Sequence, residues 1–167
     1  MALQTWGTMA FSGAGNKGVV ATGNSTNGEV LILPVRRASD NKPVYLALQS
    51  VPFGSGRANV GIYYKELASL SDFVDASAFA KNWPGKHQAS RMSSAYSTMT
   101  LQKDSTIGFL YEEETFGKAY TIVYKNYSVE YITDSLYTYD PTVVPSDVVP
   151  AGIDSKYKLV KTYFGKA

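Results

Sequence analysis

The stretch that decides the fold is Ser93-Ser94-Ala95-Tyr96-Ser97-Thr98-Met99-Thr100-Leu101-Gln102-Lys103-Asp104-Ser105-Thr106-Ile107-Gly108-Phe109-Leu110-Tyr111-Glu112-Glu113-Glu114. It consists of two runs of strand-favouring residues joined by a polar turn, which predicts an antiparallel hairpin. A tyrosine lies near the start of the first run, and three carboxylates close the second. We therefore expect the chemical centre of the chain, if it has one, in this hairpin.

The length of the turn determines which glutamate faces Tyr96. A two- or four-residue turn centred on Asp104-Ser105 places Tyr96 opposite Glu113, and an odd turn places it opposite Glu112. Because a shift by one residue exchanges the two faces of a strand, the sequence leaves both pairings open.

Further strands are predicted on both sides of the hairpin. Upstream, residues 29–35, 44–51 and 57–66 are strand-like, and Pro34 suggests that the first run ends there or lies at an edge. Downstream, residues 120–132 alternate between apolar and polar positions. Residues 67–83 have near-helical spacing, with Ser71 or Asp72 as candidate caps, and 156–164 could form a last strand or a short helix. About seven strands at such spacing predict an all-β domain: a sandwich, a barrel or part of a propeller.

Composition excludes several classes of protein. The 167 residues suit one domain or slightly more, and 44% hydrophobic residues allow a real core. A net charge of +2 gives no basic stripe for nucleic acid. The absence of cysteine removes disulfides, thiolate zinc sites and a cysteine nucleophile. No run approaches the roughly 18 apolar residues of a membrane span, and no signal peptide is visible at the N-terminus.

Two other motifs do not indicate a site. The glycine-rich turn at 12–18 lacks the Gly-Lys-Ser/Thr sequence and the helix that a phosphate loop needs. His87, the only histidine, lies in a polar segment that predicts a solvated loop. We expect no metal and no cofactor. The 13 tyrosines fit either the rim of a β core or a surface on which sugars stack.

Tyr96 and Arg57 are the candidates for chemistry. A tyrosine phenol ionises near pH ~10, so it needs a carboxylate to take its proton or a guanidinium to stabilise the phenolate. Arg57 follows a glycine-rich loop, and a guanidinium binds a carboxylate through two parallel hydrogen bonds. The alternative interpretation is a half-buried strand tyrosine with solvated glutamates and a surface arginine.

Several of these segments resemble the end of bacterial sialidase catalytic domains. They are Ser94-Ala95-Tyr96-Ser97-Thr98-Met99, the turn Lys103-Asp104, Ile107 to Glu113, and Tyr120-Thr121-Ile122-Val123-Tyr124. Upstream, Arg57-Ala58-Asn59-Val60-Gly61-Ile62-Tyr63 resembles the segment that holds the third arginine of the family's substrate-binding triad. Gln4 to Thr8 and Asn16-Lys17-Gly18 are similar to a large secreted Gram-positive type. The resemblance covers roughly residues 4–133.

The resemblance implies a fold and a reaction. Sialidases are six-bladed β-propellers that cleave terminal sialic acid from glycans with retention, through a tyrosine nucleophile. By resemblance, residues 1–133 would form the C-terminal blades, and 134–167 a tail or a segment that closes the propeller. Tyr96 would be the nucleophile, and Arg57 would bind the substrate carboxylate. Glu112 matches the glutamate that orients the first arginine of the triad.

The sequence also lacks several functional residues of the family. No residues match the first two triad arginines, the aspartate acid/base or the glutamate that activates the tyrosine. We therefore expect the C-terminal half of a bacterial, secreted or cell-surface sialidase domain that is inactive without the missing N-terminal half. Its expected partners are that half and sialylated glycans, with no nucleic acid and no membrane span. The competing hypothesis is a non-catalytic β-sandwich that binds glycans through its tyrosines.

Overall fold

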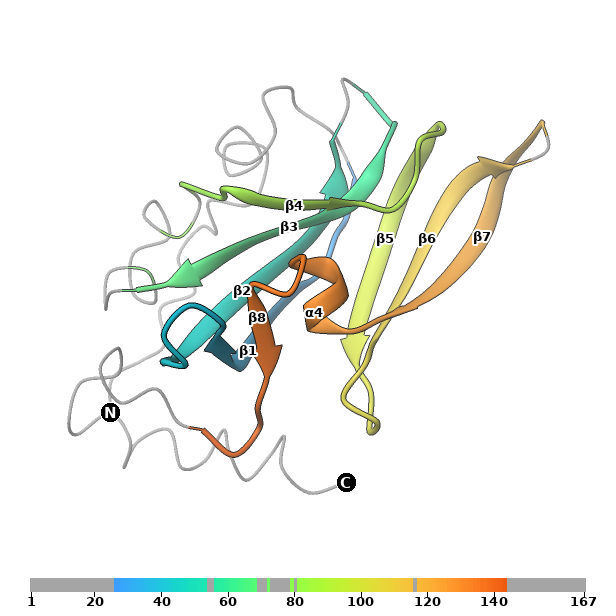
Figure 1. Ribbon diagram of the computed structural model, residues 1–167. Helices are drawn as coiled ribbons and strands as arrows, with labels where there is room; N and C mark the ends of the chain where they lie inside the picture. The colour runs from blue at the N-terminus through green and yellow to red at the C-terminus, as the bar shows by residue number, and fades with distance from the viewer. Residues whose placement is uncertain are drawn as a thin grey trace, which may run out of the picture.

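The computed structural model describes residues 26–53, 56–68, 72, 79, 81–115 and 117–143. In this part of the chain, strands form two antiparallel sheets (Figure 1). One has the strand order β4-β3-β2-β1-β8, and the other has the order β5-β6-β7. The all-β, antiparallel prediction is confirmed, and the six-bladed propeller stays a prediction. The elements are β1 Val30–Arg37, β2 Pro43–Pro52, β3 Val60–Leu67, β4 Gly85–Gln88, β5 Ser94–Leu101, β6 Ile107–Thr115, β7 Lys118–Tyr127, α4 Val129–Ile132 and β8 Tyr137–Tyr139.

The side chains of β1 point to two faces of its sheet, one buried and one exposed. Leu33 and Val35 are buried, whereas Ile32, which precedes Leu33, is 45% exposed, as expected for a strand with one face on a core. The prediction that Pro34 ends this run is wrong, because β1 continues to Arg37. The alternative of an edge position fits in part, since β8 pairs only with Val35 to Arg37 and leaves Pro34 beyond the paired stretch. Proline is tolerated because β8 pairs only from Val35 onward, and Pro34 uses its carbonyl oxygen to accept from the Asp140 amide.

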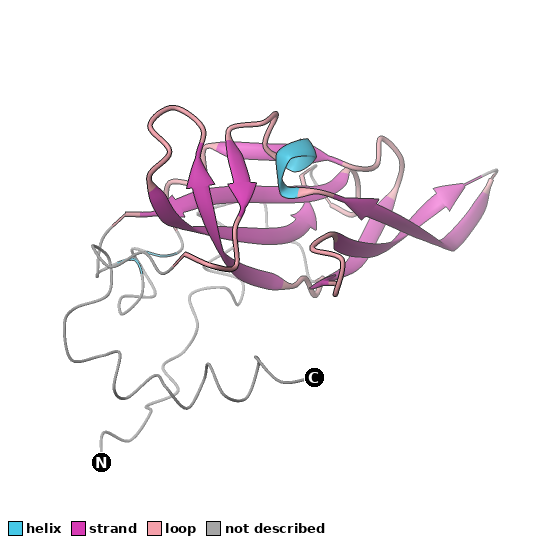
Figure 2. Ribbon diagram, turned by 60° about the horizontal axis from the view of Figure 1, so that its bottom comes forward, coloured by secondary structure: helices cyan, strands magenta, loops and turns pink. Residues whose placement is uncertain are grey.

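The larger of two apolar clusters in the described part of the chain lies between the two sheets. Its fully buried side chains come from β1 to β3, from β5 and β6, and from the helix. Helix α4 lies between β8 and the three-stranded sheet, as Figures 1 and 2 show. The two sheets are therefore one folding unit in this part of the chain. The largest of the fully buried side chains are Tyr111, Phe109, Leu46, Leu48, Ile62, Leu67, Ile107 and Ile132.

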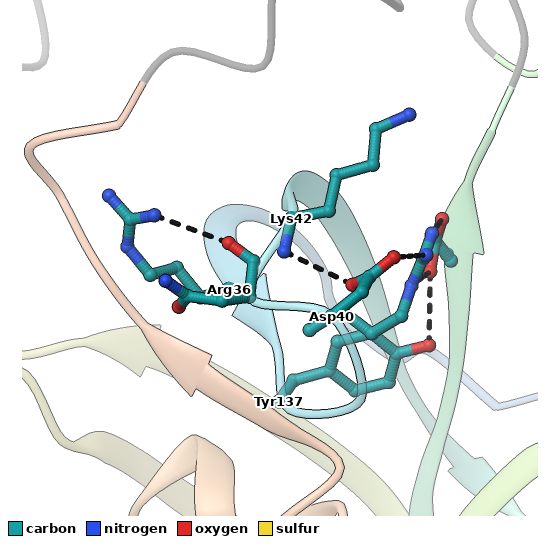
Figure 3. Close-up of polar contacts among 7 residues, drawn as sticks. Arg36, Asp40, Lys42 and Tyr137 are labelled. Atoms are coloured by element: carbon teal, nitrogen blue, oxygen red, sulfur yellow. Dashed lines mark hydrogen bonds and ion pairs between the residues drawn. The ribbon is translucent and has the colours of Figure 1, made fainter.

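Polar contacts fasten β8 to the rest of the five-stranded sheet (Figure 3). Arg37 on β1 donates to both carboxylate oxygens of Glu66 on β3 and, over 2.7 Å, to Asp40. Tyr137 on β8 donates its hydroxyl to the same Glu66 over 3.2 Å. The Glu66 carboxylate therefore links three strands, and β8, which lies beyond the predicted boundary at residue 133, belongs to this sheet.

Two local predictions are wrong. His87 lies in β4, half-buried, with its ring edge-on to Tyr127 at 4.9 Å and to Tyr131 at 5.1 Å between centroids. Burial lowers the pKa of the His87 imidazole, and the charge of Asp134 partly opposes this. The run predicted over 120–132 ends as a strand at Tyr127, and Ser128 caps the short helix α4.

Some predictions fall wholly or mostly outside the described residues. They include the glycine-rich turn at 12–18, the segment 156–164 and most of the helix predicted over 67–83. Within the described ranges, no helix is long and apolar enough to cross a membrane. The same ranges contain no group of three or more histidines and acidic residues placed to hold a metal ion.

We expect the chain to lose stability at alkaline pH. Burial is the main cause that raises the phenol pKa of Tyr111, Tyr127 and Tyr137 to about 12 in the folded chain, whereas an unfolded tyrosine ionises near ~10. The stability that these neutral phenols contribute is complete below pH ~10 and is lost as the pH rises toward 12. Thermal unfolding followed by circular dichroism should show a falling midpoint in this window. The fall should be shallower in Tyr111→Phe, and an unchanged slope in that variant would contradict the prediction.

Candidate functional site

The segment that carries Arg57 is fixed against the start of β5. The Ser94 amide donates to the Arg57 carbonyl oxygen over 2.9 Å, and Ala58 forms an isolated bridge with Ser93. The Ser94 hydroxyl oxygen accepts from the Val60 amide over 2.8 Å. These contacts bring Arg57 beside the hairpin of β5 and β6.

The pairing of β5 with β6 is interrupted at Tyr96. Ser97 pairs with Tyr111, but Ser94 pairs with Glu113, so Ala95 and Tyr96 together face the single residue Glu112. Two residues against one form a β-bulge, a device that redirects a side chain. The turn between the paired residues Leu101 and Ile107 has an odd length, which selects Glu112 over Glu113 as the residue opposite Tyr96.

Arg57 and Tyr96 are in direct contact. The Arg57 Nη2 donates to the Tyr96 phenol oxygen over 3.1 Å, and the Arg57 Cζ lies 4.9 Å from the centroid of the ring. The phenol is 38% exposed, so a ligand can reach it. A guanidinium only donates hydrogen bonds, so the phenol oxygen is the acceptor in this contact.

Glu112 is half-buried beside this pair, and one of its carboxylate oxygens lacks a donor. The Glu112 Oε2 is buried and has no hydrogen-bond partner in the described part of the chain. A buried carboxylate oxygen without a donor costs free energy, roughly 1–3 kcal/mol or more for a charged group. The geometry is therefore suited to a cationic or strongly donating group that binds Glu112.

Arg57 and Glu112 line a pocket of about 170 Å³, and Tyr96 is not among its lining residues. The pairing of the strands sets the order across it: the Arg57 segment lies beside Ser94 on β5, then Glu113 on β6, then Thr121 on β7. The pocket combines one guanidinium with several carboxylates, which suits an anionic ligand that also carries hydroxyl groups. The lining residues are Arg57, Ser93, Ser94, Ala95, Glu112, Glu113, Glu114 and Tyr120.

Tyr120 is the lining residue that sequence reasoning missed. Its backbone has φ of 61°, a left-handed conformation that costs an L-residue roughly 1–2 kcal/mol. A second bulge causes this: Glu113 pairs with Thr121 and Thr115 pairs with Lys118, so Ala119 and Tyr120 stand opposite Glu114. No sequence signal marks this bulge, because Tyr120 fits the alternation of the run that contains it.

The comparisons with known proteins find similarity only among solved structures. No protein-family model and no curated protein matches the chain. Among solved structures, it is similar to the intramolecular trans-sialidase from Ruminococcus gnavus in complex with oseltamivir carboxylate, at 23% identity and a TM-score of 0.48, covering 68% of this chain and 24% of that one. It is also similar to the leech intramolecular trans-sialidase complexed with 2,7-anhydro-Neu5Ac, at 21% identity and a TM-score of 0.47, covering 68% of this chain and 17% of that one. The chain spans about a quarter or less of the length of either structure.

Proposed function

We propose that the chain is part of a sialidase-type glycoside hydrolase that releases terminal sialic acid with retention through Tyr96. The observation that carries the proposal is the contact between Arg57 and the Tyr96 phenol beside a pocket lined by glutamates. The sequence motifs around both residues support the same assignment. Sialylated glycans are then the substrates, and a secreted or cell-surface location in a bacterium follows from where such glycans occur.

Arg57 is assigned to the substrate carboxylate. A guanidinium carries its N–H donors in a planar fork and can bind both oxygens of a carboxylate at once. Arg57 would hold the anionic group of the sugar in this way. The candidate nucleophile lies directly beside it, because Arg57 Nη2 donates to the Tyr96 phenol oxygen.

Tyr96 is assigned as the nucleophile. Its phenol oxygen would attack the anomeric carbon while the bond to the leaving sugar oxygen breaks, giving a covalent tyrosyl glycoside that water then hydrolyses. A neutral phenol suits this task because the substrate carboxylate would repel an anionic nucleophile. A base must accept the phenol proton and an acid must protonate the leaving oxygen. By resemblance, both lie in the missing N-terminal half, outside this chain.

Glu112 is assigned to a neighbouring arginine. Its buried Oε2 has no donor in the described part of the chain, and an arginine from the N-terminal half would satisfy it. The complete pocket would therefore be assembled from both halves. In that assembly Glu112 is a positioning residue, because it would act through the arginine that it orients.

Saturation-transfer NMR with sialyllactose and lactose tests the assignment on the chain alone. We expect the chain to bind sialyllactose more tightly than lactose, because only the sialylated sugar offers a carboxylate to Arg57. Equal binding of the two sugars would contradict a sialic-acid site. It would favour the competing hypothesis of a neutral glycan-binding module, which the exposed tyrosines of β7 and α4 also fit.

The chain alone should not turn over a fluorogenic sialoside. It holds the candidate nucleophile but no residues that match the acid/base aspartate or the activating glutamate. The measurement is fluorophore release by the wild-type chain and by Tyr96→Phe. Turnover by the wild type that is lost in Tyr96→Phe would confirm the nucleophile and show that the prediction of an inactive fragment is wrong.

A further inference from the structure

Two buried serines of β5 lie on either side of Tyr96, and they differ in their hydrogen bonds. Ser94 and Ser97 are each 4% exposed. The Ser97 hydroxyl has no hydrogen-bond partner in the described part of the chain, whereas the Ser94 hydroxyl both donates and accepts. Burying a hydroxyl costs free energy unless it is hydrogen-bonded. The fold therefore uses the hydroxyl of Ser94 and not that of Ser97.

The Ser94 hydroxyl joins two backbone segments. It accepts from the Val60 amide over 2.8 Å and donates to the Met92 carbonyl oxygen over 3.1 Å. The same carbonyl oxygen accepts from the Asn59 amide over 3.0 Å. In addition, the Ser94 amide donates to the Arg57 carbonyl oxygen over 2.9 Å. Together these contacts fix the backbone that follows Arg57 against the start of β5.

The position of the Arg57 side chain depends on this backbone. Arg57 is exposed, so burial in a core does not set the direction of its side chain. Two residues later, Asn59 turns the chain through a left-handed conformation with φ of 58°, which asparagine tolerates. Ser94 is bonded to the Arg57 segment and begins the strand that carries Tyr96. It therefore relates the guanidinium to the phenol that it contacts.

We propose that Ser94 is a positioning residue that sets the Arg57 guanidinium for the substrate carboxylate beside Tyr96. A hydroxyl carries one proton, and Ser94 donates it to Met92, so the hydroxyl acts through the Arg57 segment and not on the sugar. Bidentate binding of a carboxylate requires the plane of the guanidinium to point at both oxygens, so a displaced segment weakens it. This inference rests on the proposed function, in which Arg57 binds the carboxylate of sialic acid.

The test is NMR titration of the full chain with sialyllactose and lactose. Ser94→Ala should weaken sialyllactose binding about three- to ten-fold, the effect of one lost hydrogen bond, and leave lactose binding unchanged. Ser97→Ala is the matched control: it removes an equally buried hydroxyl of the same strand that has no partner, so both affinities should stay unchanged. Ser94→Thr keeps the hydroxyl and should retain the preference for sialyllactose.

A double-mutant cycle separates positioning from direct contact with the sugar. In the Arg57→Ala background, Ser94→Ala should cause no further loss of sialyllactose affinity, because the residue through which it acts is absent. Additive losses would mean that Ser94 contacts the sugar itself, and equal losses for both sugars would mean a general distortion of the pocket. Either result overturns the proposal. Ser94→Cys, whose thiol is a weaker hydrogen-bonding group, provides the same comparison if Ser94→Ala does not fold.

Failure of the proposed function has a different signature. In that case the wild type would show no preference for sialyllactose, or Arg57→Ala would retain the preference. Failure of the present inference alone would leave the effect of Arg57→Ala intact, while Ser94→Ala bound sialyllactose as tightly as the wild type.

Discussion

Replacing Arg57 with alanine should remove the preference of the chain for sialyllactose over lactose. A hydrogen bond to a charged group contributes roughly 1.5–3 kcal/mol, which corresponds to about ten- to a hundred-fold in affinity. The Arg57 contact with Tyr96 would also be lost, but lactose has no carboxylate and its binding should change little. The measurement is NMR titration of both sugars with the wild type and the variant.

Two further variants make this result specific. Arg91→Ala removes an exposed arginine that is not among the pocket-lining residues and should leave both affinities unchanged. Arg57→Lys keeps the charge but not the planar fork, so its affinity should lie between those of the wild type and the alanine variant. If Arg57→Ala bound sialyllactose as tightly as the wild type, the carboxylate would be bound elsewhere and the proposed function would fail.

Replacing Phe109 with alanine should remove a large part of the stability of the chain. Phe109 is fully buried in the core between the two sheets, and truncation of such a phenylalanine costs about 3–5 kcal/mol. Domains of this kind have a total stability of roughly 5–15 kcal/mol. Because both sheets share the core, urea unfolding followed by circular dichroism should show one transition shifted to lower urea.

The neighbouring residue provides the control. Leu110 points to the other face of β6 and is 39% exposed, so Leu110→Ala should change the free energy of unfolding by only about 0.5 kcal/mol. Two separate transitions in either variant would mean that the sheets unfold independently. A loss below about 1 kcal/mol in Phe109→Ala would mean that the core can close around the missing ring.

Most strands could be predicted because they follow from local pattern. The strands that contain Leu33 and Val35, or Phe109 and Tyr111, appear in sequence as short apolar runs bounded by polar turns. Strand β4 could not be predicted, since Gly85 to Gln88 carries no such pattern and is a strand only because it pairs with β3. His87 was assigned to a loop for the same reason, as its aromatic neighbours lie far along the chain.

The candidate site likewise contains residues that could be predicted from the sequence and one that could not. The sequence motifs single out Arg57, Tyr96 and Glu112. In the structure Arg57 and Glu112 line one pocket, and Tyr96 contacts Arg57 without lining that pocket. Tyr120 was not found, because it reaches the pocket only through a bulge, and an extra residue in one strand leaves the hydrophobic pattern almost unchanged. Helix α4 was missed although Ser128 is a good cap, since one helical turn is too short to give a period.

The bulge on β5 also bears on how such a chain evolves. Because Ala95 and Tyr96 share the position opposite Glu112, deleting the Tyr96 codon would leave an unbroken ladder with the buried Ala95 in place. Loss of Tyr96 in this way would convert a nucleophile-bearing hairpin into an ordinary one, while Arg57 and the pocket glutamates remained. A single in-frame deletion therefore separates a candidate catalyst from a sugar receptor on the same scaffold, without an unstable intermediate.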